Sequence, residues 1–243
     1  MKYKIKYEKR VDGRKFDELR PMEAKVGVIP RADGSAFFKI GKTWAYAAVY
    51  GPRDLYPKAL QNPRKGLLRC KYSMMPFSGA GERVRPGPSR RSKEISLVTE
   101  KALLPALNLE DFPNAVVDVF IELPQTDAGS RCAGITAAAM ALADAGIQMK
   151  DLPAAVAIGK VNDKFVVDLC YEEEAYEGIV IDMPIAMLPR SKKITLLQMD
   201  GQLDPNDLDE LLKIIEKPIM EIHKLQVKAL KDKFKNIKLD VED

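Results

Sequence analysis

A run of small residues from Cys132 to Asp144 constrains the fold of this 243-residue chain more than any other segment. Six of its 13 residues are Ala, the residue with the highest helix propensity. Gly146 follows and ends the pattern. Because side chains this small let a helix approach a sheet closely, we expect a central, buried helix over about residues 130–145.

The five residues before this run, Asp127 to Arg131, gather groups that bind anions. Gly129 supplies flexibility, Ser130 is suited to cap the helix, and Arg131 carries a forked cation that fits phosphate. Helix N-termini attract anions because their first backbone N–H groups have no partner within the helix. The junction therefore predicts a phosphate site, and the alternative is a capped, buried helix with an incidental Arg.

Apolar patterns and turn residues divide the chain into approximate halves, residues 20–146 and 152–236, and its length allows one large domain or two small ones. In the first half we expect strands at Met22–Ile29, Ser35–Ile40, Thr43–Tyr50, Leu67–Met75 and Ala115–Leu123, and a helix at Arg90–Leu107 capped by Ser89. In the second half we expect strands at Ala154–Val161, Lys164–Leu169, Ile179–Leu188 and Ile194–Met199. A long helix then runs from Pro205 to Lys235, and Pro218 must kink or split it. Residues 1–20 are expected to form an extended arm and residues 79–88 a mobile loop. Because runs of strands are each followed by helices, the pattern indicates the α+β class.

Composition excludes several kinds of chemistry. The only histidine, His223, lies in a helical pattern far from the Gly-rich and Arg-rich segments, so we expect it on a helix surface. This argues against a Ser-His-Asp triad or a multi-histidine metal site. Three scattered cysteines argue against a disulfide framework, and no apolar run approaches the ~20 residues that span a bilayer. The N-terminus lacks the apolar core of a secretory signal, so we expect a cytoplasmic protein without a membrane partner.

Positive charge is concentrated between Arg64 and Lys93. This segment contains nine Lys or Arg residues and only one acid, Glu82. Tyr72 and Phe77 interleave with these charges, as a site that stacks single-stranded bases requires. The segment therefore predicts a surface for nucleic acid, and the alternative is a solvated basic loop with core aromatic residues.

Two further places can carry chemistry. Arg90 and Arg91 begin a predicted helix, where positive charge opposes the helix dipole unless an anion is bound there. Asp182 stands alone in an apolar run, so it lies either on a solvated strand face or in a functional site.

Motifs along nearly the whole chain resemble the RNase PH family, and most of all the catalytic RNase-PH-like subunits of archaeal exosomes. They include Arg10–Arg14, Asp17–Pro21, Ala32–Ser35, Ala47–Arg53, Met75–Ser78, Pro86–Ser92, Ala141–Gly146, Asp182–Met187 and Thr195–Gly201. The resemblance implies one RNase PH-like domain over residues 1–243, with the ribosomal protein S5 domain 2-like fold. It also implies phosphorolysis, in which inorganic phosphate attacks the RNA 3′ end and releases nucleoside diphosphates.

The resemblance further implies partners and site residues. The partners are single-stranded RNA, a second RNase-PH-like subunit in a hexameric ring and cap proteins with S1 or KH-type domains. Asp182 would act as the catalytic acid or as a ligand of Mg²⁺ or Mn²⁺. Inorganic phosphate would be bound by Gly129, Ser130, Arg131 and Arg91, and RNA by Arg90, Arg91, Arg69, Lys71 and Lys58. A non-catalytic ring scaffold and a free-standing tRNA-trimming enzyme stay open as alternatives.

The chain departs from the family pattern just before Asp182. Gly178–Asp182 lacks a Glu that relatives commonly have and is slightly longer, which would impair catalysis if it displaced Asp182. The acids at Glu172, Glu173, Glu174 and Glu177 are expected to form a solvated loop, and the alternative is that one of them faces a metal. Asp168 is expected to be structural.

Overall fold

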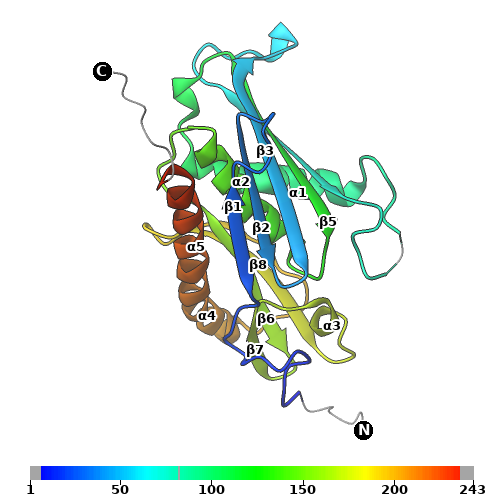
Figure 1. Ribbon diagram of the computed structural model, residues 1–243. Helices are drawn as coiled ribbons and strands as arrows, with labels where there is room; N and C mark the ends of the chain where they lie inside the picture. Colours follow the sequence, from blue (N-terminus) through cyan, green and yellow to red (C-terminus); the bar gives the residue numbers. More distant parts are fainter. Residues whose placement is uncertain (1–6, 82, 236–243) are drawn as a thin grey trace.

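The computed structural model describes residues 7–81 and 83–235, so Glu82 and the two chain ends lie outside the described residues. Two sheets flank one central helix (Figure 1). The first sheet has the order β1-β2-β3-β5-β4, and the second has the order β7-β6-β8-β9. Neighbouring strands are antiparallel except β4 and β5, which are parallel.

The strands of the first sheet are β1 (Met22–Val26), β2 (Gly34–Ile40), β3 (Thr43–Asp54), β4 (Leu67–Met74) and β5 (Ala115–Gln125). Those of the second are β6 (Ala154–Val161), β7 (Lys164–Val167), β8 (Val180–Leu188) and β9 (Lys193–Leu197). The helices are α1 (Arg90–Leu103), α2 (Ser130–Asp144), α3 (Tyr171–Glu174), α4 (Pro205–Ile214) and α5 (Glu216–Lys235). Single 3₁₀ turns lie at Lys58–Leu60, Leu104–Ala106 and Leu109–Asp111. The predicted α+β class is confirmed.

Helix α2 is the centre of the molecule, as the run of small residues predicts. Twelve of its 15 residues are buried, and it contacts strands of both sheets. Close packing is possible because small residues face each other: a Cβ placed on Gly34 of β2 would lie 2.2 Å from the backbone nitrogen of Ala145. One core therefore runs through both halves and fixes the start of α2 between them.

The C-terminal helical segment is split, as Pro218 requires. Helix α4 ends at Ile214 and α5 begins at Glu216, so Pro218 lies in the first turn of α5. A proline is tolerated there because the N–H groups of a first turn have no partner within the helix. Helix α5 packs along β1, β6 and α2 (Figure 1).

Some predicted bounds are wrong by a few residues. Strand β1 ends at Val26 because Gly27 takes a φ of +69° and leaves the strand. Strand β3 continues to Asp54, which pairs with Ala115 of β5. The predicted helix at 90–107 is α1 followed by the 3₁₀ turn at Leu104–Ala106, and Ser89 caps it through a capping box with Ser92.

The N-terminal arm has no helix or strand over residues 7–21, but it is not a free extension. Tyr7, Arg10 and Arg20 are only 6%, 3% and 5% exposed. The prediction of an extended arm is therefore wrong for the described part of the segment. The reason is that acids from residues far along the chain neutralise its arginines, which a local pattern does not reveal.

Candidate active site

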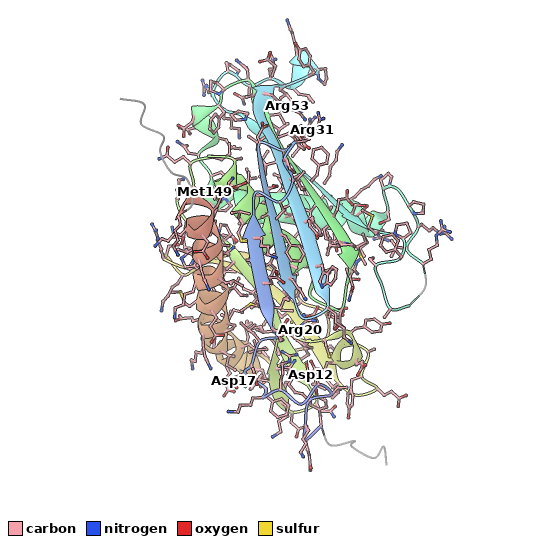
Figure 2. All side chains as sticks on the ribbon, viewed as in Figure 1. Asp12, Asp17, Arg20, Arg31, Arg53 and Met149 are labelled. Carbon is pink, nitrogen blue, oxygen red and sulfur yellow. The ribbon has the colours of Figure 1, made fainter. Side chains whose placement is uncertain are left out.

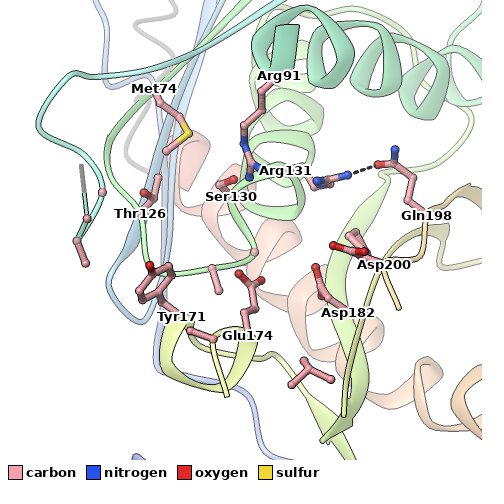
Figure 3. Close-up of a pocket in the computed structure, with 18 of the residues that line it drawn as sticks. Met74, Arg91, Thr126, Ser130, Arg131, Tyr171, Glu174, Asp182, Gln198 and Asp200 are labelled. Carbon is pink, nitrogen blue, oxygen red and sulfur yellow. Dashed lines mark hydrogen bonds between the residues drawn. The ribbon is translucent and has the colours of Figure 1, made fainter. Parts of the chain in front are cut away.

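A pocket of about 750 Å³ opens between the start of α2 and the second sheet (Figure 3). Its lining comes from the first half of α1, the start of α2 and the residues before it, α3, β8, the segment that follows β9, the end of β4 and the loop after β4. The polar and charged side chains that line it are Arg91, Glu94, Thr126, Ser130, Arg131, Tyr171, Glu174, Asp182, Gln198 and Asp200. The pocket therefore joins residues of both halves.

One side of the pocket, here called the cationic wall, consists of Arg91, Gly129, Ser130 and Arg131. Gly129 precedes α2 with a φ of +62°, a conformation that costs glycine little, and its N-cap position carries no capping side chain. Ser130 is thus the first residue of the helix and not its cap, which corrects the sequence prediction. Backbone N–H groups and two guanidinium groups face the pocket together, an arrangement that binds phosphate.

Arg131 is held in place by the second half of the molecule. Its Nη1 donates to Oε1 of Gln198 over 2.5 Å, and Gln198 donates in turn to Glu94 of α1 over 3.0 Å. Glu94 also lies 3.7 Å from Arg131 as an ion pair. These contacts orient the guanidinium before any ligand arrives.

The opposite side, here called the acidic wall, consists of Glu174, Asp182 and Asp200. Asp182 and Asp200 exchange backbone hydrogen bonds of 3.0 and 2.8 Å, which fix one beside the other. Figure 3 shows the carboxylates of Glu174 and Asp182 pointing into the space below Arg91 and Ser130. The longer segment before Asp182 therefore does not displace it from the pocket.

Two carboxyl groups of the acidic wall, those of Glu174 and Asp182, have raised pKa values. Burial and the nearby charge of Asp182 raise the pKa of Glu174 to about 7, although Arg91, Arg20 and the Gly129 backbone oppose the shift. Burial, opposed by Arg131 and Arg91 and assisted by Asp200, raises the pKa of Asp182 to about 6. A carboxyl with such a pKa can give up or take a proton under physiological conditions.

The acidic wall also fits a hard divalent cation. Oδ1 of Asp182 is buried and has no hydrogen-bond partner among the described residues. Mg²⁺ is commonly held by one or two carboxylates together with waters and substrate phosphates. Among residues 7–81 and 83–235, no three His, Cys, Asp or Glu side chains are grouped to hold a metal by themselves. Asp182 with one neighbouring acid would therefore need substrate oxygens to complete the coordination.

The acids after Asp168 correct the prediction of a solvated loop. Glu172 and Glu177 are exposed, but Glu173 is fully buried and Glu174 lines the pocket. Glu174 is thus the one of these four acids that lines the pocket, and a metal-facing role for it stays a prediction. Sequence reasoning assigned no role to Asp200 and Gln198, although both lie in the motif Thr195–Gly201 and follow β9, the strand that pairs with β8.

The predicted RNA-binding residues lie outside the pocket, except Arg91. Arg90 is exposed beside it at the start of α1. Arg69 and Lys71 lie on β4 and alternate with buried residues, so they face away from the core. Arg69 pairs with Asp118 over 2.6 Å, and Lys71 lies 5.3 Å from the ring centre of Phe120. Lys58 is exposed in a 3₁₀ turn after β3.

Three expectations about single residues can be compared with the structure. Tyr72 is 4% exposed and belongs to the core, so it cannot stack on a base, whereas Phe77 is 75% exposed. Asp168 is buried and accepts hydrogen bonds from Arg20, which confirms its structural role. His223 lies half-buried on α5 and outside the lining of the pocket, and burial lowers its pKa.

Two remaining features concern cysteines and membranes. Cys70, Cys132 and Cys170 are buried, free thiols. None of the helices described here combines the length and the apolar character needed to cross a bilayer.

Comparison with known proteins identifies the class. Residues 18–148 match the 3′ exoribonuclease family, domain 1, and residues 151–215 match domain 2 of the same family. The chain therefore belongs to the RNase PH family of 3′ exoribonucleases, and its resemblance to that family is confirmed.

The similar proteins include subunits of exosomes. The chain is 50% identical over 225 residues to a protein named exosome complex component Rrp41 from Methanopyrus kandleri, and the match covers 93% of each chain. It is 51% identical over 234 residues to the Thermococcus kodakarensis protein of the same name, covering 96% of this chain and 93% of that one.

Two solved structures have the same fold. Rice (Oryza sativa) Rrp46 has a TM-score of 0.81 and 24% identity, with 91% of this chain and 100% of that chain covered. The Archaeoglobus fulgidus exosome with RNA bound to the active site has a chain with a TM-score of 0.76 and 25% identity, with 89% and 92% covered. The predicted RNase PH-like fold is confirmed.

Proposed function

We propose that this chain is the catalytic, phosphate-dependent 3′→5′ exoribonuclease subunit of an exosome ring. One observation carries the proposal: a single pocket sets the cationic wall, with Ser130 and Arg131, opposite the acidic wall, with Glu174 and Asp182. Its family and its similarity to proteins named Rrp41 support the same activity.

Phosphorolysis needs both walls. An oxygen of inorganic phosphate forms a bond to the terminal phosphorus of RNA, and the bond from that phosphorus to the 3′-oxygen breaks. A nucleoside diphosphate leaves, and the freed 3′-oxygen takes up a proton. Two phosphate groups repel each other, so the reaction requires fixed cations and N–H donors. In this proposal Gly129, Ser130, Arg131 and Arg91 hold inorganic phosphate.

The acidic wall supplies the proton and the cation site. Glu174 has the pKa of about 7 that suits a proton donor at neutral pH. Asp182, assisted by Asp200, has the unpartnered oxygen that suits Mg²⁺ or Mn²⁺. Such an ion would neutralise negative charge on the leaving 3′-oxygen. This division gives Asp182 the metal-ligand role and Glu174 the role of the acid.

The partners follow from the same proposal. Single-stranded RNA would reach the pocket past Arg90 and Arg91, and Arg69, Lys71 and Lys58 would contact it at a distance from the pocket. A second RNase-PH-like subunit would complete a hexameric ring, and cap proteins with S1 or KH-type domains would bind that ring. We place the assembly in the cytoplasm.

The test compares RNA degradation with and without inorganic phosphate, using this chain alone and mixed with an RNase-PH-like partner subunit. Phosphate-dependent release of nucleoside diphosphates only from the mixture is the expected result. Release by the chain alone would instead support a free-standing tRNA-trimming enzyme. RNA binding without release from either sample would contradict catalysis and support a non-catalytic scaffold.

A further inference from the structure

The N-terminal segment of residues 7–20, here called the strap, lies against both walls of the pocket without lining it. Its arginines Arg10 and Arg20 reach the residues next to Glu174 and next to Ser130. Figure 2 labels Arg20 and Asp12 of the strap at the end of the molecule where β7 and α3 lie. The contacts on each wall are different and can be separated by mutation.

On the acidic wall, Arg10 holds Glu173 in a fully buried ion pair. Its Nε and Nη2 donate to the two carboxylate oxygens over 2.8 and 2.7 Å, and neither side chain is exposed. The remaining N–H groups donate to backbone carbonyls of the strap and of Val167 and Asp168. The guanidinium is thus fully used inside the protein and has no donor left for RNA.

Glu173 is equally saturated. Tyr7 donates its hydroxyl to Oε1 over 2.5 Å, and the backbone N–H of Cys170 donates to Oε2 over 3.0 Å. Burial alone would raise the pKa of Glu173, but the bonds from Arg10, Tyr7 and Cys170 outweigh it and lower the pKa. Helix α3 is only four residues long, so this anchor fixes the direction of the next side chain, Glu174.

On the cationic wall, Arg20 supports the loop before α2. It donates to both carboxylate oxygens of Asp168 over 2.9 and 2.7 Å and to the carbonyl of Asp127. A Cβ on Gly129 would lie 3.4 Å from its Nη2, which shows how closely the guanidinium approaches this loop. Asp127 also accepts the Tyr171 backbone N–H over 3.0 Å, so the same loop is tied to α3.

We propose that Arg10 and Arg20 are positioning residues for the pocket, Arg10 chiefly for the acidic wall through Glu173 and Arg20 chiefly for the cationic wall through Asp127. The inference rests on the proposed function, because the walls have a measurable effect only if the pocket performs phosphorolysis. It assigns the strap a part in catalysis without any contact to substrate.

The test uses Arg10→Lys, Tyr7→Phe and Arg20→Lys in the assembled ring. Arg10→Lys is expected to lower kcat about 10-fold and Tyr7→Phe about 3-fold, with the KM for phosphate changed less than about 2-fold. Arg20→Lys is expected to raise the KM for phosphate about 10-fold and to change kcat less. Tyr7→Phe removes one hydroxyl only, so it tests the acidic wall even where Arg10→Lys fails to fold.

Asp17→Asn is the matched control, since it removes an exposed ion pair of 3.0 Å between the strap and Lys217 of α5. It should leave kcat and KM at wild-type values. Hydrogen exchange of peptides covering residues 169–176 gives a second readout, and it should be faster in Tyr7→Phe and Arg10→Lys but not in Asp17→Asn.

A loss of kcat with an unchanged KM in all three variants would overturn the inference, because a strap that only stabilises the fold changes the active fraction alone. Unchanged exchange at residues 169–176 in Tyr7→Phe and Arg10→Lys would overturn it as well. Wild-type rings without phosphate-dependent release would contradict the proposed function instead, and the exchange measurement would still test the strap.

Discussion

The two walls of the pocket are built in different ways. The cationic wall comes mostly from one continuous stretch, Gly129–Arg131, at the start of a buried helix, with Arg91 added from α1. The acidic wall comes from three separate places, the end of α3, the start of β8 and the segment after β9. Opposite charges therefore reach one cavity from opposite halves of the fold.

This difference shows how each wall obtains its chemistry. Gly129, Ser130 and Arg131 are groups that any helix start with these residues would present, whereas Arg91 comes from α1 and Gln198 of the second half orients Arg131. The acidic wall depends on burial and on mutual repulsion, which raise the pKa values of Glu174 and Asp182. The effect of the surroundings on pKa is clearest in two adjacent residues. The pKa of Glu173 is lowered, whereas the pKa of Glu174 is raised.

The largest effect is expected on the acidic wall. Glu174→Gln and Asp182→Asn should each lower turnover by about 10² to 10⁴-fold, because each removes a proton donor or a cation ligand while keeping the side-chain shape. RNA affinity should not fall, since only negative charge is lost. Single-turnover rates and RNA titrations measure the two quantities. Glu172→Gln, on the exposed side of the same helix, is the control. A variant whose turnover stays within about threefold of wild type would show that the replaced residue takes no part in the reaction.

The cationic wall should respond through phosphate. Arg131→Ala removes a charged donor that Gln198 and Glu94 hold in place, so the KM for phosphate should rise between about 10-fold and 100-fold. Turnover at saturating phosphate should change less. Initial rates over a phosphate series measure this, with Lys93→Ala as a cation outside the pocket. An unaltered phosphate dependence would place Arg131 outside the binding site.

The free energy of unfolding should depend on pH through Asp182 of the acidic wall. The folded-state pKa of Asp182, about 6, lies above its ordinary value of 3.8, so ionisation opposes folding, and stability falls as pH rises through this window. Asp182→Asn should therefore stabilise the chain at pH 8 by on the order of 2 kcal/mol, and at pH 4 the gain should vanish. Urea unfolding at the two pH values measures it, with exposed Asp209→Asn as the control. An equal gain at both pH values would contradict the burial of a charged carboxylate.

The smallest effect is expected at the start of α1. Arg90→Ala and Arg91→Ala should each weaken single-stranded RNA binding about 3-fold to 10-fold at low salt, because each removes one phosphate contact. The slope of affinity against salt should fall by about 0.7 per variant. Only Arg91→Ala should also raise the KM for phosphate, since Arg91 lines the pocket and Arg90 does not. Lys101→Ala, in the last turn of α1, is the control. Equal salt slopes in all variants would indicate that the basic segment binds a partner other than RNA.

Prediction from sequence succeeded where a local pattern sufficed. The small-residue run predicted a buried helix, and Ser89 was predicted to cap α1. Pro218 predicted the break before α5. Asp182 was singled out because a carboxylate in an apolar strand is costly without a reason. Several failures share a cause: Glu173 and Arg10 were expected in an exposed loop and an extended arm, but they pair with each other across the chain and are buried.

The amino-acid sequence by itself determined the elements of this protein, the close-packed central helix and the anion-binding groups at its start, because propensity, capping and N–H donors act over a few residues. Only the tertiary structure decided that Glu174, Asp182 and Asp200 share one cavity with Arg131, and that the strap reaches the neighbours of both walls. Burial and the distance between charges set their pKa values, and both depend on contacts between segments far apart in the chain, as between Arg20 or Arg91 and Glu174.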